Sequence, residues 1–89
     1  MCKQYYFYIL KCKDNSLYSG VTKDINARII YHNKGKGSKF VRKRRPAELV
    51  YSEPHDSLSS ARLRENEVKK WRREKREELI KAGFPRRVT

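Results

Sequence analysis

Long apolar runs are missing from this 89-residue chain. No stretch approaches the roughly 20 apolar residues that a helix needs to cross a bilayer, so the sequence predicts no transmembrane segment. No hydrophobic signal segment follows Met1, and we therefore expect the protein in the cytoplasm. The chain also has no internal repeat and no long low-complexity segment. Its length suits one domain, which we place at residues 1–83, with residues 84–89 as a frayed tail.

Cysteine is scarce as well. Cys2 and Cys12 are too few to cross-link a small secreted domain, and neither belongs to a Cys-x-x-Cys or Cys/His zinc pattern. The sequence therefore predicts two reduced thiols.

Acidic residues are few relative to basic ones. The chain has 10 Asp and Glu against 23 Lys and Arg, which gives a formal net charge of +13. Such an excess of one sign repels itself unless a polyanion neutralises it, so nucleic acid is the first candidate partner. An anionic membrane surface ranks second, because the C-terminal helices carry acids among their bases.

Two strands are predicted near the N-terminus. Residues 5–12 form a nearly unbroken aromatic and aliphatic run, which is typical of a strand covered on both faces. Alternation puts Tyr8 and Phe7 on opposite faces of this strand. A short polar turn then predicts an antiparallel return strand, Leu17–Val21, which completes a hairpin. Gly20 permits close approach of a backbone or a ligand, although a simple bend explains this glycine equally well.

A helix is predicted to begin after Asp24, whose side chain suits the N-cap position. Ile25 and Ile29 share the inward stripe of this helix with Arg28 and His32. A guanidinium beside the core needs an anion, which is either a carboxylate of the protein or a phosphate of a ligand. From this helix alone, Arg28 reaching out to water is the simpler interpretation.

The densest positive stretch is residues 34–45, with seven Lys or Arg and no acid. Its glycines predict a flexible linker, anchored by Phe40, that can wrap a phosphate backbone; a solvated surface loop is the alternative. Pro46 closes this linker, Ala47–Ser52 forms a third strand, and Pro54 ends that strand. The predicted nucleic-acid contacts are Lys34, Lys36, Lys39, Arg42, Lys43, Arg44, Arg45 and, from a later helix, Lys69.

A second helix is predicted over Ser57–Lys70, with Ser57 as the N-cap. Glu65 lies on the apolar side of this helix, which makes it a carboxylate inside a hydrophobic stripe. Arg62 and Lys69 stand three and four residues away, and a salt bridge with them is the simpler explanation. The alternative is that Glu65 faces Arg28 and a bound metal.

The last predicted element is a third helix, Trp71–Ala82. Trp71, Leu79 and Ala82 are its expected anchors, Gly83 stops it, and Pro85 prevents its continuation. Three strands and three helices in this order predict an α+β domain, in which the helices pack on a three-stranded antiparallel sheet.

The order of these elements resembles the GIY-YIG nuclease superfamily over nearly the whole chain. The resemblance is closest to small stand-alone members and more distant to the N-terminal nuclease module of the repair protein UvrC. Tyr6-Phe7-Tyr8 stands at the first motif and Tyr18-Ser19-Gly20 at the second. In these motifs Tyr6 replaces a glycine and Ser19 an isoleucine, and Val21 stands where UvrC-like members carry lysine.

The resemblance implies a divalent-metal-dependent endonuclease acting on DNA, with Tyr8, Tyr18, Arg28, His32 and Glu65 as catalytic residues. Glu65 would hold a single Mg²⁺ or Mn²⁺, and Arg28 would bind the scissile phosphate. Tyr8 or Tyr18 would be the general base. His32 would orient a tyrosine hydroxyl or assist the proton transfer. DNA repair or recombination is the process that such a module would serve.

Two other interpretations stay open. One is a catalytically inactive domain that binds DNA or RNA through its basic surface, and the other is an adaptor for an acidic protein partner. Retention of Tyr8, Tyr18, Arg28 and Glu65 favours the enzyme, and we expect DNA rather than RNA. No part of the sequence is an evident reader of base sequence, so we expect structure-selective or weakly selective binding, with a partner protein able to supply substrate choice.

Overall fold

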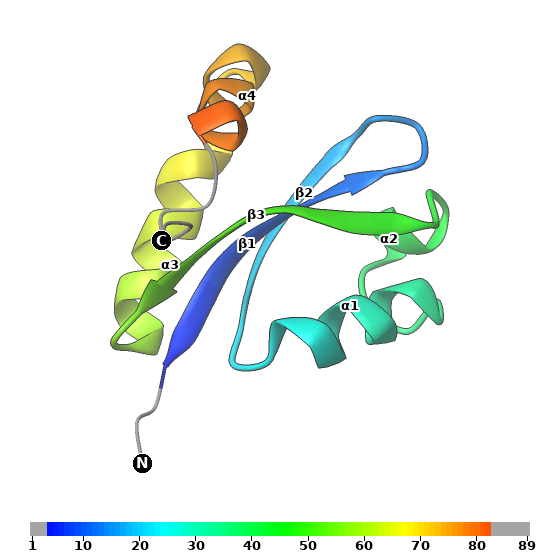
Figure 1. Cartoon of the computed structure of the whole chain (residues 1–89), viewed down its shortest axis with the longest axis horizontal. Coiled ribbons are helices and arrows are strands. Elements are labelled where there is room, and N and C mark those ends of the chain that lie inside the picture. The colour runs from blue at the N-terminus through cyan, green and yellow to red at the C-terminus, as the bar shows by residue number, and fades with distance from the viewer. Residues whose placement is uncertain (1–3, 83–89) are drawn as a thin grey trace.

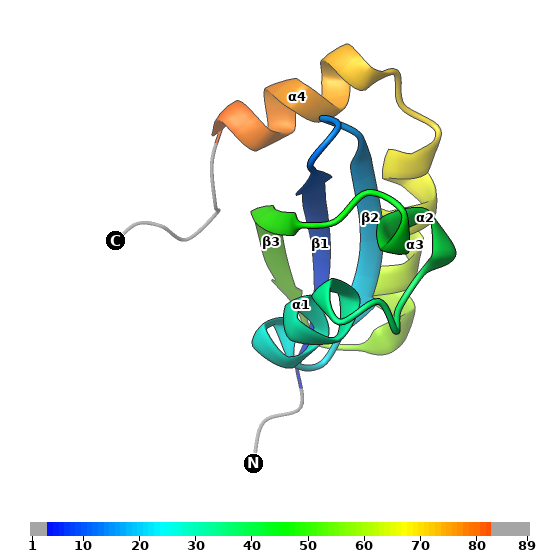
Figure 2. The ribbon, with the colours of Figure 1, turned by 90° about the vertical axis from the view of Figure 1, so that its right-hand side faces the viewer.

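The computed structural model of the protein describes residues 4–82. Its centre is a three-stranded antiparallel sheet made of β1 (Tyr5–Cys12), β2 (Leu17–Thr22) and β3 (Ala47–His55) in the order β2-β1-β3. Helices pack on both faces of this sheet (Figures 1 and 2). The predicted α+β fold class is therefore confirmed, with four helices within residues 4–82 instead of three.

The central strand β1 is covered on both faces, as its apolar run predicted. Phe7 to Leu10 are almost completely buried. The hairpin to β2 is also confirmed, and Asn15 in its turn adopts a left-handed backbone conformation with φ of 72°. Asparagine tolerates that conformation better than most residues because its short side chain bonds locally. Cys12 at the end of β1 is a free, buried thiol, and burial raises its pKa.

The third strand is longer than predicted. It continues to His55, and Pro54 lies within it, opposite Tyr6 of β1. The prediction that Pro54 ends the strand is wrong because β3 is an edge strand. On the open side of an edge strand no neighbouring strand accepts a hydrogen bond, so a proline, which has no N–H group, can stand there without loss.

One face of the sheet carries α1 (Ile25–Asn33) and α2 (Lys39–Arg42). Asp24 is the N-cap of α1, and its carboxylate accepts a hydrogen bond from the N–H of Ala27. The predicted linker contains the short helix α2. Its anchor is Val41, which is completely buried in the core, whereas Phe40 is 38% exposed.

The other face carries α3 (Leu58–Lys69) and α4 (Arg73–Ala82). Ser57 caps α3 as predicted. Trp71 lies in the turn between the two helices, so the third predicted helix begins two residues late. Trp71 packs on the core together with Leu79 and Ile80, while Ala82 is exposed.

Some expectations lie outside the described residues. These are the frayed tail at residues 84–89, the stop signals Gly83 and Pro85, and the thiol of Cys2. Within residues 4–82, no helix combines the length and the apolar character that crossing a membrane requires.

Candidate active site

All five predicted catalytic residues line one cavity of about 630 Å³. They come from four elements: β1 supplies Tyr8, β2 supplies Tyr18, α1 supplies Arg28 and His32, and α3 supplies Glu65. Because α1 and α3 lie on opposite faces of the sheet and β2 is an edge strand, the cavity lies at the β2 edge, where the two helical layers meet. Residues up to 57 positions apart in sequence therefore share one concave surface.

Tyr8 and His32 form a buried polar pair at the base of the cavity. The Tyr8 hydroxyl lies 3.2 Å from Nε2 of His32, and the two side chains are 3% and 2% exposed. Burial, with a smaller contribution from Tyr18, raises the pKa of Tyr8. Burial and the charge of Arg28 lower the pKa of His32. Both groups are therefore uncharged near neutral pH, and the tautomer of His32 sets the direction of their hydrogen bond.

Two glycines make room for this pair. A Cβ atom at Gly20 would lie 2.5 Å from the hydroxyl oxygen of Tyr8, and one at Gly37 would collide with Nδ1 of His32. Nδ1 has no hydrogen-bond partner among residues 4–82. Gly20 is thus explained by the close approach of the Tyr8 ring, and the role of Gly37 was not predicted from the sequence.

Tyr18 forms part of the cavity wall. Its ring meets the His32 ring edge-on, with 5.3 Å between centroids, and stacks on Phe40 at 6.1 Å. Phe40 therefore packs against a side chain of the cavity wall and is not a buried anchor of the linker.

Arg28 faces the cavity without a protein anion. None of the salt bridges found within residues 4–82 includes its guanidinium. The guanidinium carbon lies 5.3 Å from the centroid of the Tyr31 ring, and the side chain is half-buried. A partly buried cation that lacks a carboxylate partner is a good ligand for a phosphate.

Of the two basic residues expected to neutralise Glu65, Lys69 pairs with it. The Glu65 carboxylate pairs with Nζ of Lys69 at 2.9 Å, yet it also lines the cavity with 19% of the side chain exposed. The described residues contain no cluster of three or more His, Cys, Asp or Glu that could hold a metal ion. A single carboxylate still fits Mg²⁺, which keeps several waters and takes phosphate oxygens as its other ligands.

The predicted nucleic-acid contacts are divided among several surfaces. Lys36 lines the candidate active site, whereas Arg42, Lys43 and Arg45 line a separate cavity beside Pro46. Lys34 and Lys39 are exposed, and Lys69 is paired with Glu65.

Arg44 makes several contacts within the protein. Its guanidinium pairs with Asp14 at 3.1 Å, donates to the carbonyl of Phe40 at 2.9 Å, and covers the Phe40 ring at 4.0 Å. Arg44 ties the segment after α2 to the β1–β2 hairpin.

Sequence reasoning missed several residues of the cavity. Tyr31, Ser38 and Asn66 line it, as does Arg62, which was considered only as a neutraliser of Glu65. Helical spacing offered a signal for two of them, because Tyr31 follows Arg28 by three residues and Arg62 precedes Glu65 by three. For Ser38, only the folded path of the linker brings the residue to the site.

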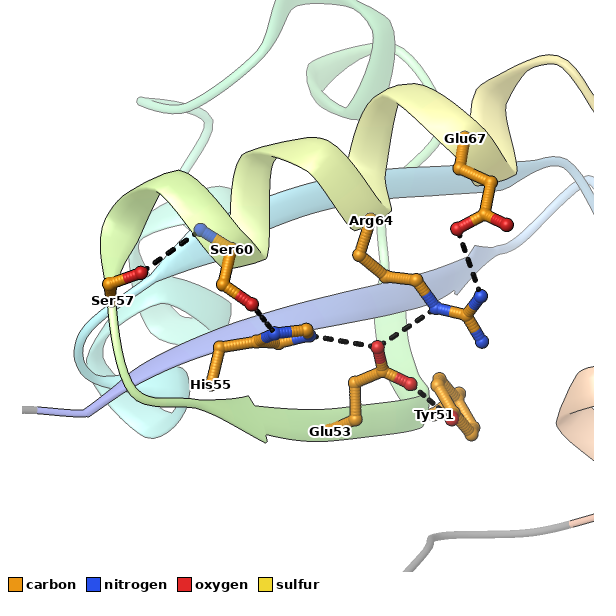
Figure 3. Close-up of polar contacts among 7 residues, drawn as sticks. All are labelled: Tyr51, Glu53, His55, Ser57, Ser60, Arg64 and Glu67. Atoms are coloured by element: carbon orange, nitrogen blue, oxygen red, sulfur yellow. Dashed lines mark hydrogen bonds and ion pairs between the residues drawn. The ribbon is translucent and has the colours of Figure 1, made fainter.

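A second polar network holds α3 in place from its other side (Figure 3). The Glu53 carboxylate accepts hydrogen bonds from the Tyr51 hydroxyl at 2.6 Å, from Nε2 of His55 at 2.9 Å and from Nε of Arg64 at 2.9 Å. Nδ1 of His55 in turn contacts the Ser60 hydroxyl at 2.7 Å. The network joins β3 to α3 and so fixes the rotation of the helix that carries Glu65 next to Arg64.

These contacts also set the charge of Glu53. Burial alone would raise the pKa of this carboxyl, but the hydrogen bonds from Tyr51 and His55 and the charge of Arg64 outweigh burial and lower it. Burial, followed by the hydrogen bond to Glu53 and the charge of that carboxylate, raises the pKa of Tyr51 to about 12.

Comparisons with known proteins identify the family of the chain. A family model described as the GIY-YIG catalytic domain matches residues 4–78. The chain is 51% identical over 80 residues to a UPF0213 protein of Staphylococcus saprophyticus, covering 90% of this chain and 98% of that protein. It is 48% identical over 77 residues to a UPF0213 protein of Staphylococcus aureus, covering 86% and 94%.

A solved structure of another UPF0213 protein is also similar to this chain. The solution NMR structure of a UPF0213 protein from Bacillus halodurans superposes with a TM-score of 0.60 at 42% sequence identity, covering 90% of this chain and 85% of that chain. A domain match over most of the chain, together with relatives about half identical, shows that the protein belongs to the GIY-YIG catalytic domain family, whose nuclease-type function makes nucleic acid its substrate class.

Proposed function

We propose that this protein is a divalent-metal-dependent endonuclease that hydrolyses phosphodiester bonds of DNA, in repair or recombination. The observation that carries the proposal is the convergence of Tyr8, Tyr18, Arg28, His32 and Glu65 on one cavity. Hydrolysis requires a deprotonated water, compensation of charge on the non-bridging oxygens and stabilisation of the leaving oxygen. Each of these tasks has a chemically suitable side chain in the cavity.

Arg28 is the residue proposed to bind the scissile phosphate. Its planar guanidinium can donate two parallel hydrogen bonds to phosphate oxygens, and no protein carboxylate among the described residues competes for it through a salt bridge. Lys36 and Arg62 add positive charge around the same cavity. The phosphate would therefore be drawn to the site and oriented there by the protein itself.

The Tyr8–His32 pair is proposed to move the proton of the attacking water. Tyr8 is protonated near neutral pH and not a phenolate, because its pKa is raised above the ordinary value of about 10. The hydroxyl oxygen of Tyr8 instead takes the proton from water while its own proton passes to Nε2 of His32. Burial and Arg28 disfavour the resulting imidazolium, so His32 then passes this proton to the leaving oxygen or to solvent. Tyr18 remains the second candidate base.

Glu65 is the proposed metal ligand. A divalent cation bound there would supply positive charge at the leaving and non-bridging oxygens of the phosphodiester. The Lys69 ammonium, 2.9 Å from this carboxylate, would have to yield its place to the cation. It is 56% exposed, and a surface lysine moves away at a cost of less than about 1 kcal/mol.

The test is a nicking assay with Mg²⁺ or Mn²⁺ on plain, flapped and branched DNA and on matched RNA. Wild type is compared with Glu65→Gln and with the control Glu67→Gln, which alters an exposed glutamate that pairs with Arg64 outside the cavity. We expect metal-dependent cleavage by wild type and the control and loss of cleavage in Glu65→Gln. Equal cleavage by all three would exclude Glu65 as the metal ligand.

The alternative function is a catalytically inactive DNA- or RNA-binding domain. The ion pair between Glu65 and Lys69 favours it, because this pair occupies the only carboxylate that lines the cavity among the described residues. This alternative is supported if wild type and Glu65→Gln bind nucleic acid with steep salt dependence and neither cleaves any substrate.

A further inference from the structure

A second cavity, of about 520 Å³, adjoins the candidate active site. The two cavities share Val21, Arg28, Tyr31 and Leu58, so these residues form the boundary between them. Tyr5 of β1 lines only the second cavity. A ligand bound in the active site therefore has a direct path into this neighbouring space.

The walls of the second cavity combine aromatic rings with cations. Tyr31 is 43% exposed and Leu58 is 37% exposed, although both are large apolar side chains. Arg28 covers the Tyr31 ring at 5.3 Å, and Nζ of Lys23 lies 5.6 Å from the centroid of the Tyr5 ring. The carboxylate of Asp24 at the rim is already used as the N-cap of α1.

We propose that this cavity binds a nucleobase of the substrate strand, stacked on Tyr31, next to the phosphate that Arg28 holds. The proposal rests on the proposed function of the first cavity. A nucleobase has a flat apolar face that suits an aromatic wall, and its strand carries the negative charge that the flanking cations of a +13 protein attract. Arg28 lines both cavities and so is placed to contact the phosphate and the attached nucleoside together.

This arrangement defines a class of substrate. Inside a duplex both faces of a base are covered by its neighbours, so only a base that has left the stack can lie against Tyr31. The substrate is then a strand that is single or locally unpaired, as at a flap, a branch or a frayed end.

Binding in metal-free buffer tests the inference without requiring cleavage. The probes are a short oligothymidylate and a backbone of equal length that lacks bases, and fluorescence anisotropy gives the affinity for each. The variants are Tyr31→Ala, the conservative Tyr31→Phe, and the control Ile30→Ala, which removes an exposed side chain of the same helix that lines neither cavity. Thermal unfolding checks that each variant is folded.

Wild type should bind the base-bearing strand about 10-fold more tightly than the abasic one, since a stacked base contributes on that order. Tyr31→Ala should lose this preference, while Tyr31→Phe and Ile30→Ala should keep it. The inference is overturned if Tyr31→Ala retains the preference or if Ile30→Ala loses it equally. Metal-dependent nicking by a wild type with no base preference removes this inference alone, whereas failure of wild type to bind either strand removes the proposed function too.

Discussion

Replacing Gly20 by alanine should destabilise the protein through one contact. The added Cβ would lie 2.5 Å from the hydroxyl oxygen and 2.7 Å from Cζ of Tyr8, and neither atom can move easily because the ring is 3% exposed and bonded to His32. Overpacking of this kind costs about 1–3 kcal/mol. The loss of glycine's flexibility in the unfolded chain offsets about 0.5–1 kcal/mol of that cost. The free energy of unfolding should therefore fall by about 1 kcal/mol, and by no more than about 2.5 kcal/mol.

Urea denaturation of four proteins isolates the contact: wild type, Gly20→Ala, Tyr8→Leu and the double variant. In thermal unfolding, a loss of about 1 kcal/mol at this chain length corresponds to a fall in Tm of about 4–8 °C. In the Tyr8→Leu background the ring is gone, so the alanine should cost nothing or stabilise by about 0.5 kcal/mol. The two substitutions should thus couple by at least about 1 kcal/mol. The same loss in both backgrounds would refute the explanation of Gly20 by the approach of Tyr8.

Three further predictions concern charge. Burial and the charge of Arg28 lower the pKa of His32, so the unfolded chain binds a proton at this side chain first as the pH falls below about 6.5. The free energy of unfolding measured by urea denaturation should therefore decrease from pH 7 to pH 5, and His32→Gln should lessen this decrease. Glu53→Gln should reduce the free energy of unfolding by about 2–3 kcal/mol, because the Glu53 side chain is 13% exposed and its carboxylate accepts three hydrogen bonds. In the same assay Glu67→Gln should change it by less than about 0.5 kcal/mol, because the Glu67 side chain is 56% exposed. Lys36→Ala should weaken DNA binding and reduce the slope of log affinity against log salt by about one; an unchanged slope would place Lys36 outside the interface.

Much of the fold was predictable because its signals are local. Asp24 and Ser57 cap the helices that their positions predicted, since a side-chain acceptor ahead of an apolar period satisfies the free N–H groups of the first turn. The continuous apolar run of β1 likewise predicted burial on both faces. These features depend on neighbours within a few residues, which a sequence displays directly.

The errors occur where tertiary contacts decide. The strand β3 passes through Pro54 because it lies at an edge of the sheet, a position that the strand's own residues do not reveal. The positive linker contains the short helix α2, in which Val41 reaches the core and which Ser38 caps. Composition did not reveal this helix, because the burial of Val41 depends on core residues that lie far from it in the sequence.

The candidate site shows the same division. The inward stripe of α1 predicted that Arg28 and His32 lie beside the core, and the family resemblance joined them to Glu65. The salt bridge between Glu65 and Lys69 was predicted from helical spacing, whereas the alternative, in which Glu65 faces Arg28 and a bound metal, stays a prediction. The salt bridge does not exclude this alternative, because Glu65 lines the same cavity as Arg28 while it pairs with Lys69.

The charges around the cavity separate binding from chemistry. Tyr8 and His32 are uncharged near neutral pH, so the charged groups that line the cavity are Arg28, Lys36 and Arg62 against the carboxylate of Glu65. This surplus of positive charge should attract a phosphate without help from a metal ion. Binding of nucleic acid should therefore persist in EDTA while cleavage is lost. Loss of both in EDTA would mean that the cation, and not Arg28, brings the phosphate to the site.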